Sequence, residues 1–96
     1  MSKAYIVGNN TITNTQGYKE YAEKVPQTLV EFGGKFLARG GDTLVLDGDP
    51  SGTRNVIIEF PSIESAKAWY FSKPYQEIVA GRLRNAEGYL MIVEGI

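Results

Sequence analysis

Residues 54–64 read RNVIIEFPSIE, a strand that leads at once into a helix. The β-branched run Val56–Ile58 favours extended backbone, because branched side chains pack well on a pleated surface. The proline that follows ends the strand, and Ser62 offers a side-chain oxygen to the free amides of a first helical turn. The stretch therefore predicts a strand over residues 54–60 and a helix over residues 63–71.

Upstream of this stretch, two short apolar runs predict a pair of strands at residues 35–39 and 43–47. The Gly-Gly-Asp sequence at residues 40–42 separates them, and these are turn-forming residue types. A loop rich in Gly, Asp, Pro and Ser at residues 48–52 then returns the chain to the strand at residues 54–60.

The N-terminal third predicts a strand from residue 4, continuing as far as Thr11, and then an amphipathic helix capped by Asn14 or Thr15. Pro26 lies inside the helical pattern and is expected to kink or split the helix near Lys24. The apolar positions recur at steps of three and four, at Tyr18, Tyr21, Ala22, Val25, Leu29 and Phe32.

Downstream, Ser72 is expected to cap a second helical piece whose apolar face holds Tyr75, Ile78, Val79 and Leu83. Residues 85–88 then predict a turn and residues 89–94 a last strand. This order predicts the α+β class, as a β-α-β-β-α-β sandwich with an antiparallel sheet and both helices on one face. With 96 residues, the chain is expected to form a single domain over residues 1–96.

Apolar residues stand side by side within the strands, whereas a sheet with one wet face should alternate apolar and polar residues. The chain has enough helix to cover only one face of its sheet. We therefore expect the other face to be covered by a second copy, which makes the protein a homodimer. The neighbouring apolar residues are Phe36 and Leu37, Leu44 and Val45, Ile57 and Ile58, and Leu90 to Val93.

Composition excludes several kinds of chemistry. The chain has no cysteine and no histidine, so disulfides, thiolate nucleophiles, Ser-His triads and Cys- or His-ligated metals are excluded. Asp47, Asp49 and Ser51 resemble the start of a calcium loop, but Ile58 stands where its last glutamate belongs. We therefore expect neither a metal nor a cofactor.

Charge and hydropathy restrict the partners. Ten basic and eleven acidic residues give a net charge of -1, which provides no electrostatic reason to expect nucleic acid or an anionic membrane. The first ten residues lack the apolar core of a signal peptide, and no run is long enough to span a bilayer. The expected location is the cytoplasm, and the expected partners are a second copy of the chain and a small-molecule ligand.

Three stretches in order resemble the bacterial family known as domain of unknown function 1330, over residues 4–95. The departures are an extra residue, Lys73, and Asn-Thr-Gln at residues 14–16 where Asp-Pro is commoner. The resemblance implies the ferredoxin-like dimeric α/β barrel superfamily, in which two sheets pack face to face, and it implies no activity. The stretches are GGKFLARGG at residues 33–41, VIIEFPS at residues 56–62, and AWY at residues 68–70 with Ser72, Pro74, Tyr75 and Gln76.

Arg39 and Glu59 are the first candidate site residues, since each ends an apolar strand and the two strands are expected to be neighbours. A buried charge is costly unless it is paired. One interpretation is a structural ion pair between them. The other is a polar pocket in which Arg39 grips a carboxylate and Glu59 serves as a proton acceptor.

Trp69 and Tyr70 are the next candidates. Consecutive helical residues point about 100° apart, so one ring is expected in the core and the other at the rim of a pocket. Tyr5 is a further candidate of the same kind, and no catalytic residue can be assigned.

Two functions remain open. The chain is either a small-molecule-binding or cofactor-free enzyme domain with a pocket between its layers, or a non-catalytic homodimeric binding or sensor module without an active site. The resemblance implies superfamily relatives such as cofactor-independent monooxygenases, lactone isomerases and haem-degrading proteins. The last group is disfavoured because no histidine can ligate haem iron.

Overall fold

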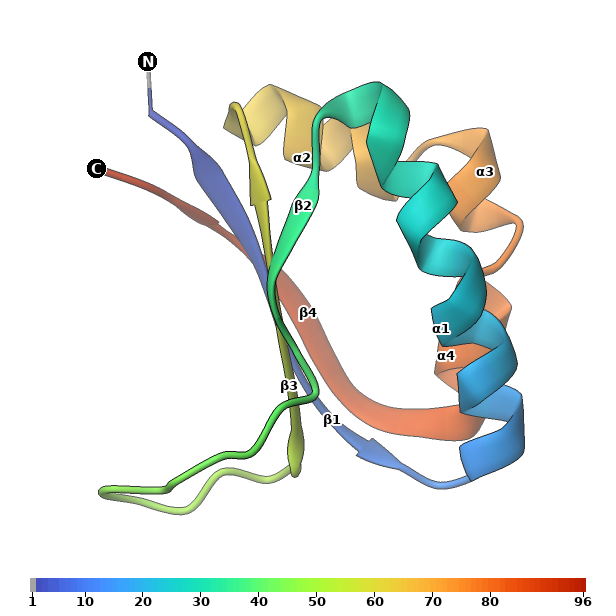
Figure 1. Ribbon diagram of the computed structural model, residues 1–96, viewed down its shortest axis with the longest axis vertical. Helices are drawn as coiled ribbons and strands as arrows, with labels where there is room; N and C mark the ends of the chain where they lie inside the picture. The colour runs from blue at the N-terminus through green and yellow to red at the C-terminus, as the bar shows by residue number, and fades with distance from the viewer. Residues whose placement is uncertain (1) are drawn as a thin grey trace.

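A computed structural model describes residues 2–96 as a four-stranded antiparallel sheet with all of its helices on one face (Figure 1). The strand order is β2-β3-β1-β4, so β1 and β3 are central and β2 and β4 are edges. This topology confirms the predicted ferredoxin-like α+β arrangement. The strands are β1 Ala4–Ile12, β2 Lys35–Arg39, β3 Arg54–Phe60 and β4 Ala86–Glu94.

The helical layer contains one long helix and several short ones. None of the helices within residues 2–96 has the length and apolar character needed to cross a membrane. The helices are α1 Thr15–Leu29, the short 3₁₀ helix η1 Val30–Phe32, α2 Ile63–Tyr70, α3 Lys73–Gln76 and α4 Val79–Asn85.

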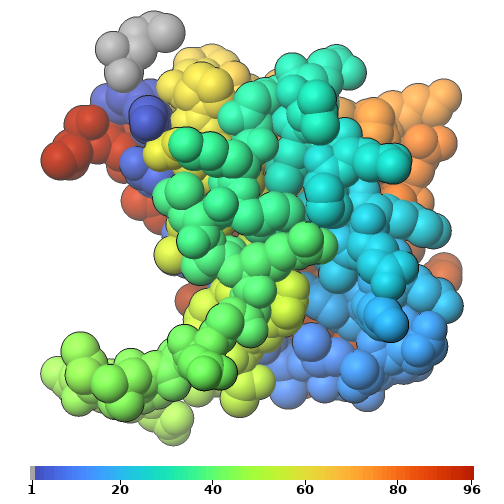
Figure 2. Space-filling model, viewed as in Figure 1, coloured from blue at the N-terminus to red at the C-terminus, as the bar shows by residue number. Residues whose placement is uncertain are grey.

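The strand predicted at residues 43–47 is wrong. Residues 40–53 form a loop that projects from the uncovered side of the sheet (Figures 1 and 2). β3 begins only at Arg54, so this apolar run has no facing strand with which to form a ladder. Leu44 and Leu46 are 83% and 88% exposed, which leaves an apolar tip in solvent.

α1 begins as predicted, because the Asn14 side chain accepts a hydrogen bond from the Gly17 amide at 3.1 Å. Of the kink or split expected at Pro26, the split is wrong, since the helix continues through Pro26 to Leu29. A proline has no amide hydrogen to offer the carbonyl four residues earlier, which here belongs to Ala22. Arg39 donates from its guanidinium to that carbonyl at 2.5 Å, so the carbonyl is satisfied from the sheet.

The second half also differs at its end. The turn expected at residues 85–88 is wrong, because α4 runs to Asn85 and β4 starts at the next residue. The Asn85 carbonyl accepts from the amides of Thr13 and Asn14 at 2.8 and 3.2 Å. This backbone contact ties the end of α4 to the start of α1 and lets the chain reverse without a separate turn.

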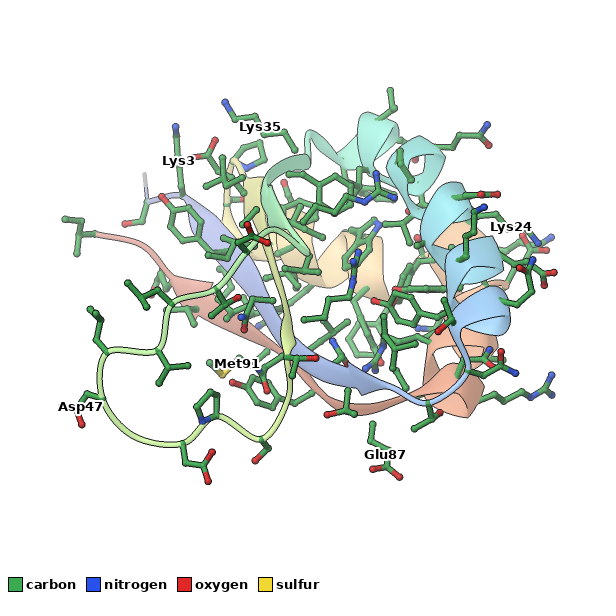
Figure 3. The ribbon with its side chains drawn as sticks, turned by 60° about the horizontal axis from the view of Figure 1, so that its bottom comes forward. Lys3, Lys24, Lys35, Asp47, Glu87 and Met91 are labelled. Carbon is green, nitrogen blue, oxygen red and sulfur yellow. The ribbon has the colours of Figure 1, made fainter. Side chains whose placement is uncertain are left out.

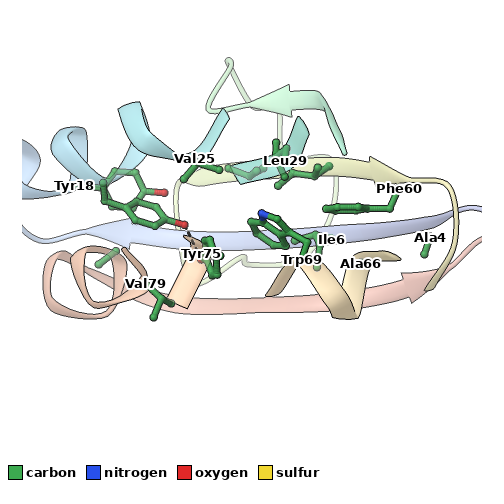
Figure 4. Close-up of a cluster of buried hydrophobic side chains, with 14 residues drawn as sticks. Ala4, Ile6, Tyr18, Val25, Leu29, Phe60, Ala66, Trp69, Tyr75 and Val79 are labelled. Atoms are coloured by element: carbon green, nitrogen blue, oxygen red, sulfur yellow. Dashed lines mark hydrogen bonds between the residues drawn. The ribbon is translucent and has the colours of Figure 1, made fainter. Parts of the chain in front are cut away.

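The core lies between the sheet and the helices (Figure 4). Trp69, Tyr75 and Phe60 are its largest fully buried side chains. The indole of Trp69 packs at a tilt against both other rings, with centroids 4.2 Å apart for Trp69 and Tyr75 and 5.6 Å apart for Trp69 and Phe60. The opposite face of the sheet, called the open face below, carries Tyr5, Glu59 and Val93, which face one another across β3, β1 and β4.

Candidate ligand-binding cavity

A β-bulge in β2 decides which face Arg39 occupies. Phe36 faces Ile58 and Ala38 faces Ile57 on β3, so Leu37 has no facing residue of its own. One extra residue shifts the alternation that follows it. Arg39 therefore faces Val56 on the helix side of the sheet, and its guanidinium lies 4.5 Å from the centroid of the Phe36 ring.

Arg39 lines a cavity between α1 and the sheet. The space between its lining side chains measures about 400 Å³, a figure that includes the part open to solvent. The enclosed part is small, since the centre of a water molecule can move through only about 30 Å³ of it. The wall is mostly aromatic and aliphatic, with four polar or charged side chains among its residues. The lining consists of Tyr18, Tyr21, Ala22, Val25, Phe36, Val56, Ile58, Trp69 and Leu90, with Asn10, Arg39, Arg54 and Arg82.

Arg82 is the most buried of the three lining arginines, at 7% exposure. Its Nη1 donates to Oδ1 of Asn10 at 3.4 Å, and its buried Nε has no hydrogen-bond partner. Asn10 itself is fully buried near the end of the central strand β1, directly beside Arg54 on β3. The backbone thus brings a charged helical residue and two strand residues to the same end of the cavity.

The other two arginines are held by neutral groups. Arg54 donates from Nε to the Tyr18 hydroxyl at 3.2 Å and lies 5.2 Å from the centroid of that ring, while Arg39 donates to a backbone carbonyl. Within residues 2–96, the ion pairs join Glu59 to Lys3 and to Lys35, and none involves an arginine. The lining therefore holds three positive charges and no carboxylate.

Two buried tyrosines form a hydrogen-bonded pair beside Arg82, with 2.8 Å between the hydroxyls of Tyr21 and Tyr75 (dashed line in Figure 4). Burial raises the pKa of Tyr21, and the neighbouring Tyr75 raises it further. Burial also raises the pKa of Tyr75, although the Arg82 guanidinium works in the opposite direction. Both phenols therefore stay protonated at neutral pH, as hydrogen-bond donors and not as bases.

Trp69 forms the inner wall of the cavity. Its Nε1 donates to Oγ1 of Thr28 at 2.9 Å, and that hydroxyl donates to the Val25 carbonyl at 2.7 Å. The indole is thereby fixed between α1 and the sheet at 1% exposure. It is the only tryptophan in the sequence, so its fluorescence reports on this cavity alone.

The structure separates the five residues singled out from sequence. Arg39 and Trp69 line the cavity. Tyr70 packs beside Trp69, with 6.3 Å between the ring centroids, but it lines a different hollow at the β4 edge with Phe71 and Leu90. Glu59 and Tyr5 face each other on the open face of the sheet, away from the cavity.

The predicted ion pair between Arg39 and Glu59 is wrong, because the bulge turns Arg39 to the opposite face. Glu59 pairs with Lys3 and Lys35 at 3.3 and 3.4 Å, and the two lysines lie at the same end of the molecule (Figure 3). Slight burial raises the pKa of Glu59, but hydrogen bonds from both lysines outweigh that effect and hold the pKa below its ordinary value.

Sequence reasoning missed Asn10, Arg54 and Arg82. The signal for Arg82 is its place seven residues after Tyr75 and three after Val79, on the buried stripe of the C-terminal helices. The sequence analysis placed Leu83 on that stripe, but Leu83 is 62% exposed. The residue that occupies the stripe is its neighbour Arg82, so the sequence did contain a charge on an apolar stripe. Among residues 2–96, no group of three acidic side chains gathers to hold a metal ion.

Comparisons with known proteins support the fold and leave the activity unassigned. A family model described as a domain of unknown function (DUF1330) matches residues 3–96. The crystal structure of the RPA0582 protein of unknown function from Rhodopseudomonas palustris matches with a TM-score of 0.78 at 17% identity, covering 99% of this chain and 83% of that one. The methylated RPA0582 protein matches with the same TM-score and identity, covering 99% and 82%. No curated protein matches the sequence.

Proposed function

The chain belongs to the family described as a domain of unknown function (DUF1330), and from that premise we propose that it is a homodimer that binds a small organic molecule in the cavity between α1 and the sheet. The observation that carries the proposal is the buried side chain of Arg82. It lines the cavity, and its Nε has no partner. Buried polar groups are rarely left unpaired, and ligand sites typically combine apolar walls with a few such groups.

The residues of the cavity favour binding over proton-transfer chemistry. A general base must lie within hydrogen-bond reach of the proton that it removes. Glu59, the acceptor considered from sequence, lies on the open face, and the lining holds no other carboxylate. Tyr21 and Tyr75 stay protonated, so they serve as donors. A non-catalytic binding or sensor module is therefore favoured over a cofactor-free enzyme.

The binding step is tested with the protein's own fluorescence. Protein is titrated with a panel of small acids, amides and alcohols while the emission of Trp69 is recorded, and native mass spectrometry is run on protein purified from its host. At least one probe should change the emission saturably and raise the melting temperature. A panel that leaves both unchanged, together with ligand-free mass spectra, would refute the proposal.

The homodimer part of the proposal is supported by the open face of the sheet. Tyr89, Met91 and Val93 of β4 are exposed large apolar side chains there, and a small chain gains stability by burying such a surface against a second copy. Figure 3 shows Met91 on the sheet, well away from the helices.

Sedimentation at micromolar concentration should give a mass about twice 10.6 kDa. Val93→Lys should shift the species to monomer, because it places a charge on the open face. Leu83→Lys is the matched control, since Leu83 is also exposed but lies on α4, on the helix side. A wild-type monomer would contradict the dimer, as would equal effects of the two substitutions.

A further inference from the structure

We infer that the ligand of this cavity is an organic carboxylate whose anionic group is held by Arg82. The inference rests on the proposed function and goes further by assigning the charge and the chemical class of the ligand. It is carried by Arg82, by the two other arginines that line the cavity, and by the apolar residues of its lining.

The first step concerns charge. A guanidinium stays protonated in proteins, so Arg82 cannot escape the cost of burial by losing its proton. Burying a charge costs several kcal/mol on the scale of ordinary proteins unless an opposite charge or good hydrogen bonds compensate for it. Arg82 has a long hydrogen bond to Asn10, at 3.4 Å, and lies close enough to the Tyr75 hydroxyl to counter part of the rise that burial causes in the pKa of that group, but its Nε is unpaired. The missing compensation is what an anion in the cavity would supply.

The second step concerns the neighbours of Arg82. Arg39 and Arg54 line the same cavity, so three like charges are gathered on walls that hold no carboxylate, in a protein whose net charge is -1. The three come from β2, β3 and α4 and are brought together only by the fold. Like charges repel, and the attraction of each arginine to a bound anion would offset that repulsion.

The third step separates an organic anion from an inorganic one. Aromatic and aliphatic side chains make up most of the wall, and Phe36 and Trp69 offer rings against which a flat apolar body can pack. A fully hydrated sulfate or phosphate would lose its water shell against these residues without compensation.

The fourth step concerns the anionic group itself. A guanidinium presents parallel N–H groups that match the two oxygens of a carboxylate. The hydroxyls of Tyr21 and Tyr75 share one hydrogen bond between them, which leaves one phenolic hydrogen free to donate. Both phenols are close enough to Arg82 for its charge to act on their pKa values. A carboxylate at Nε of Arg82 would therefore have a neutral donor beside the charged one.

The test compares two ligands of nearly the same shape, benzoate and its neutral analogue benzamide, with Trp69 fluorescence and melting temperature as readouts. On the wild-type protein, benzoate should bind at least about tenfold more tightly than benzamide, which corresponds to about 1.4 kcal/mol. This comparison needs no variant and so does not depend on the folding of one. Phenyl phosphate is the third probe, because it offers a different anionic group on the same ring.

Arg82→Met removes the anchor, and Arg84→Met is the matched control on the same helix, because Arg84 is exposed and its loss changes the net charge equally. Arg82→Met should weaken benzoate at least about tenfold and make benzoate and benzamide equivalent, whereas Arg84→Met should change neither. Without ligand, Arg82→Met should melt at or above the wild-type temperature, because it removes an uncompensated buried charge.

Several results would overturn the inference. Equal binding of benzamide and benzoate to the wild type would mean that the cavity does not select charge, and unchanged benzoate binding in Arg82→Met would mean that Arg82 is not the anchor. If phenyl phosphate bound tenfold more tightly than benzoate, the ligand class would be an organic phosphate and not a carboxylate. Each of these leaves a small-molecule site in place, whereas the failure of every probe, charged or neutral, would remove the proposed function as well.

Discussion

Replacing Thr28 with valine should destabilise the protein by removing one buried hydroxyl, which accepts from Trp69 and donates to the Val25 carbonyl. Valine keeps the branched shape of threonine and removes the hydroxyl that accepts from Nε1 of Trp69 at 2.9 Å. Both residues are buried, so water cannot replace the lost acceptor without a rearrangement of the core. A buried donor left without a partner costs about 1–3 kcal/mol. In a domain of this size, 2 kcal/mol lowers the melting temperature by about 8–16 °C.

The assay is thermal unfolding of the wild type, Thr28→Val, Thr28→Ser and Trp69→Phe. Serine keeps the acceptor and loses only a methyl group, so Thr28→Ser should lie well above Thr28→Val. Phenylalanine has no N–H, so Thr28→Val should cost much less in the Trp69→Phe background. If Thr28→Val and Thr28→Ser melt together, or if the two substitutions add within about 0.5 kcal/mol, the hydrogen bond is not what holds the indole.

Three further predictions concern residues of the sheet or beside it. The effects of Arg39→Met and Glu59→Gln on the free energy of unfolding should add within about 0.5 kcal/mol in a double-mutant cycle, because the two side chains lie on opposite faces of the sheet. A coupling energy above about 1 kcal/mol would instead support an ion pair between them. Gly52→Ala should lower the free energy of unfolding in denaturant by about 1–3 kcal/mol, because a Cβ there would stand 2.6 Å from the Asn10 carbonyl carbon. Gly41 has open space around it, so Gly41→Ala should lower the free energy of unfolding far less. Equal losses in the two variants would contradict the close approach of Gly52 to Asn10. The pKa of Glu59 is lowered from 4.5 in the folded state, so its stabilisation is present above that pH and is lost as the pH falls through the lowered value. As the pH is lowered from about 5, the free energy of unfolding should therefore fall less in Glu59→Gln than in the wild type. Parallel plots of the free energy of unfolding against pH would argue against the lysine contacts.

Local chemistry made much of the fold predictable. The helix starts at Asn14, Ser62 and Ser72 follow from side chains that accept bonds from the first helical turn. The strand at residues 54–60 follows from its β-branched run and has the bounds predicted. These signals act within a few residues, so they need no knowledge of the rest of the chain. The strand expected at residues 43–47 failed because a strand also requires a facing partner, which no local signal supplies.

Apart from the strand expected at residues 43–47, the sequence by itself determined the order of the elements, their caps and the apolar character of both sides of the sheet, because each depends on contacts between near neighbours in the chain. The cavity was decided only by the tertiary structure. The unpaired residue Leu37 shifts the register of β2 and turns Arg39 from the face of Glu59 to the face of Val56. Arg54 and Arg82 join it from elements that are distant in sequence. Side chains alternate with a period of two, so one extra residue reverses every side chain after it.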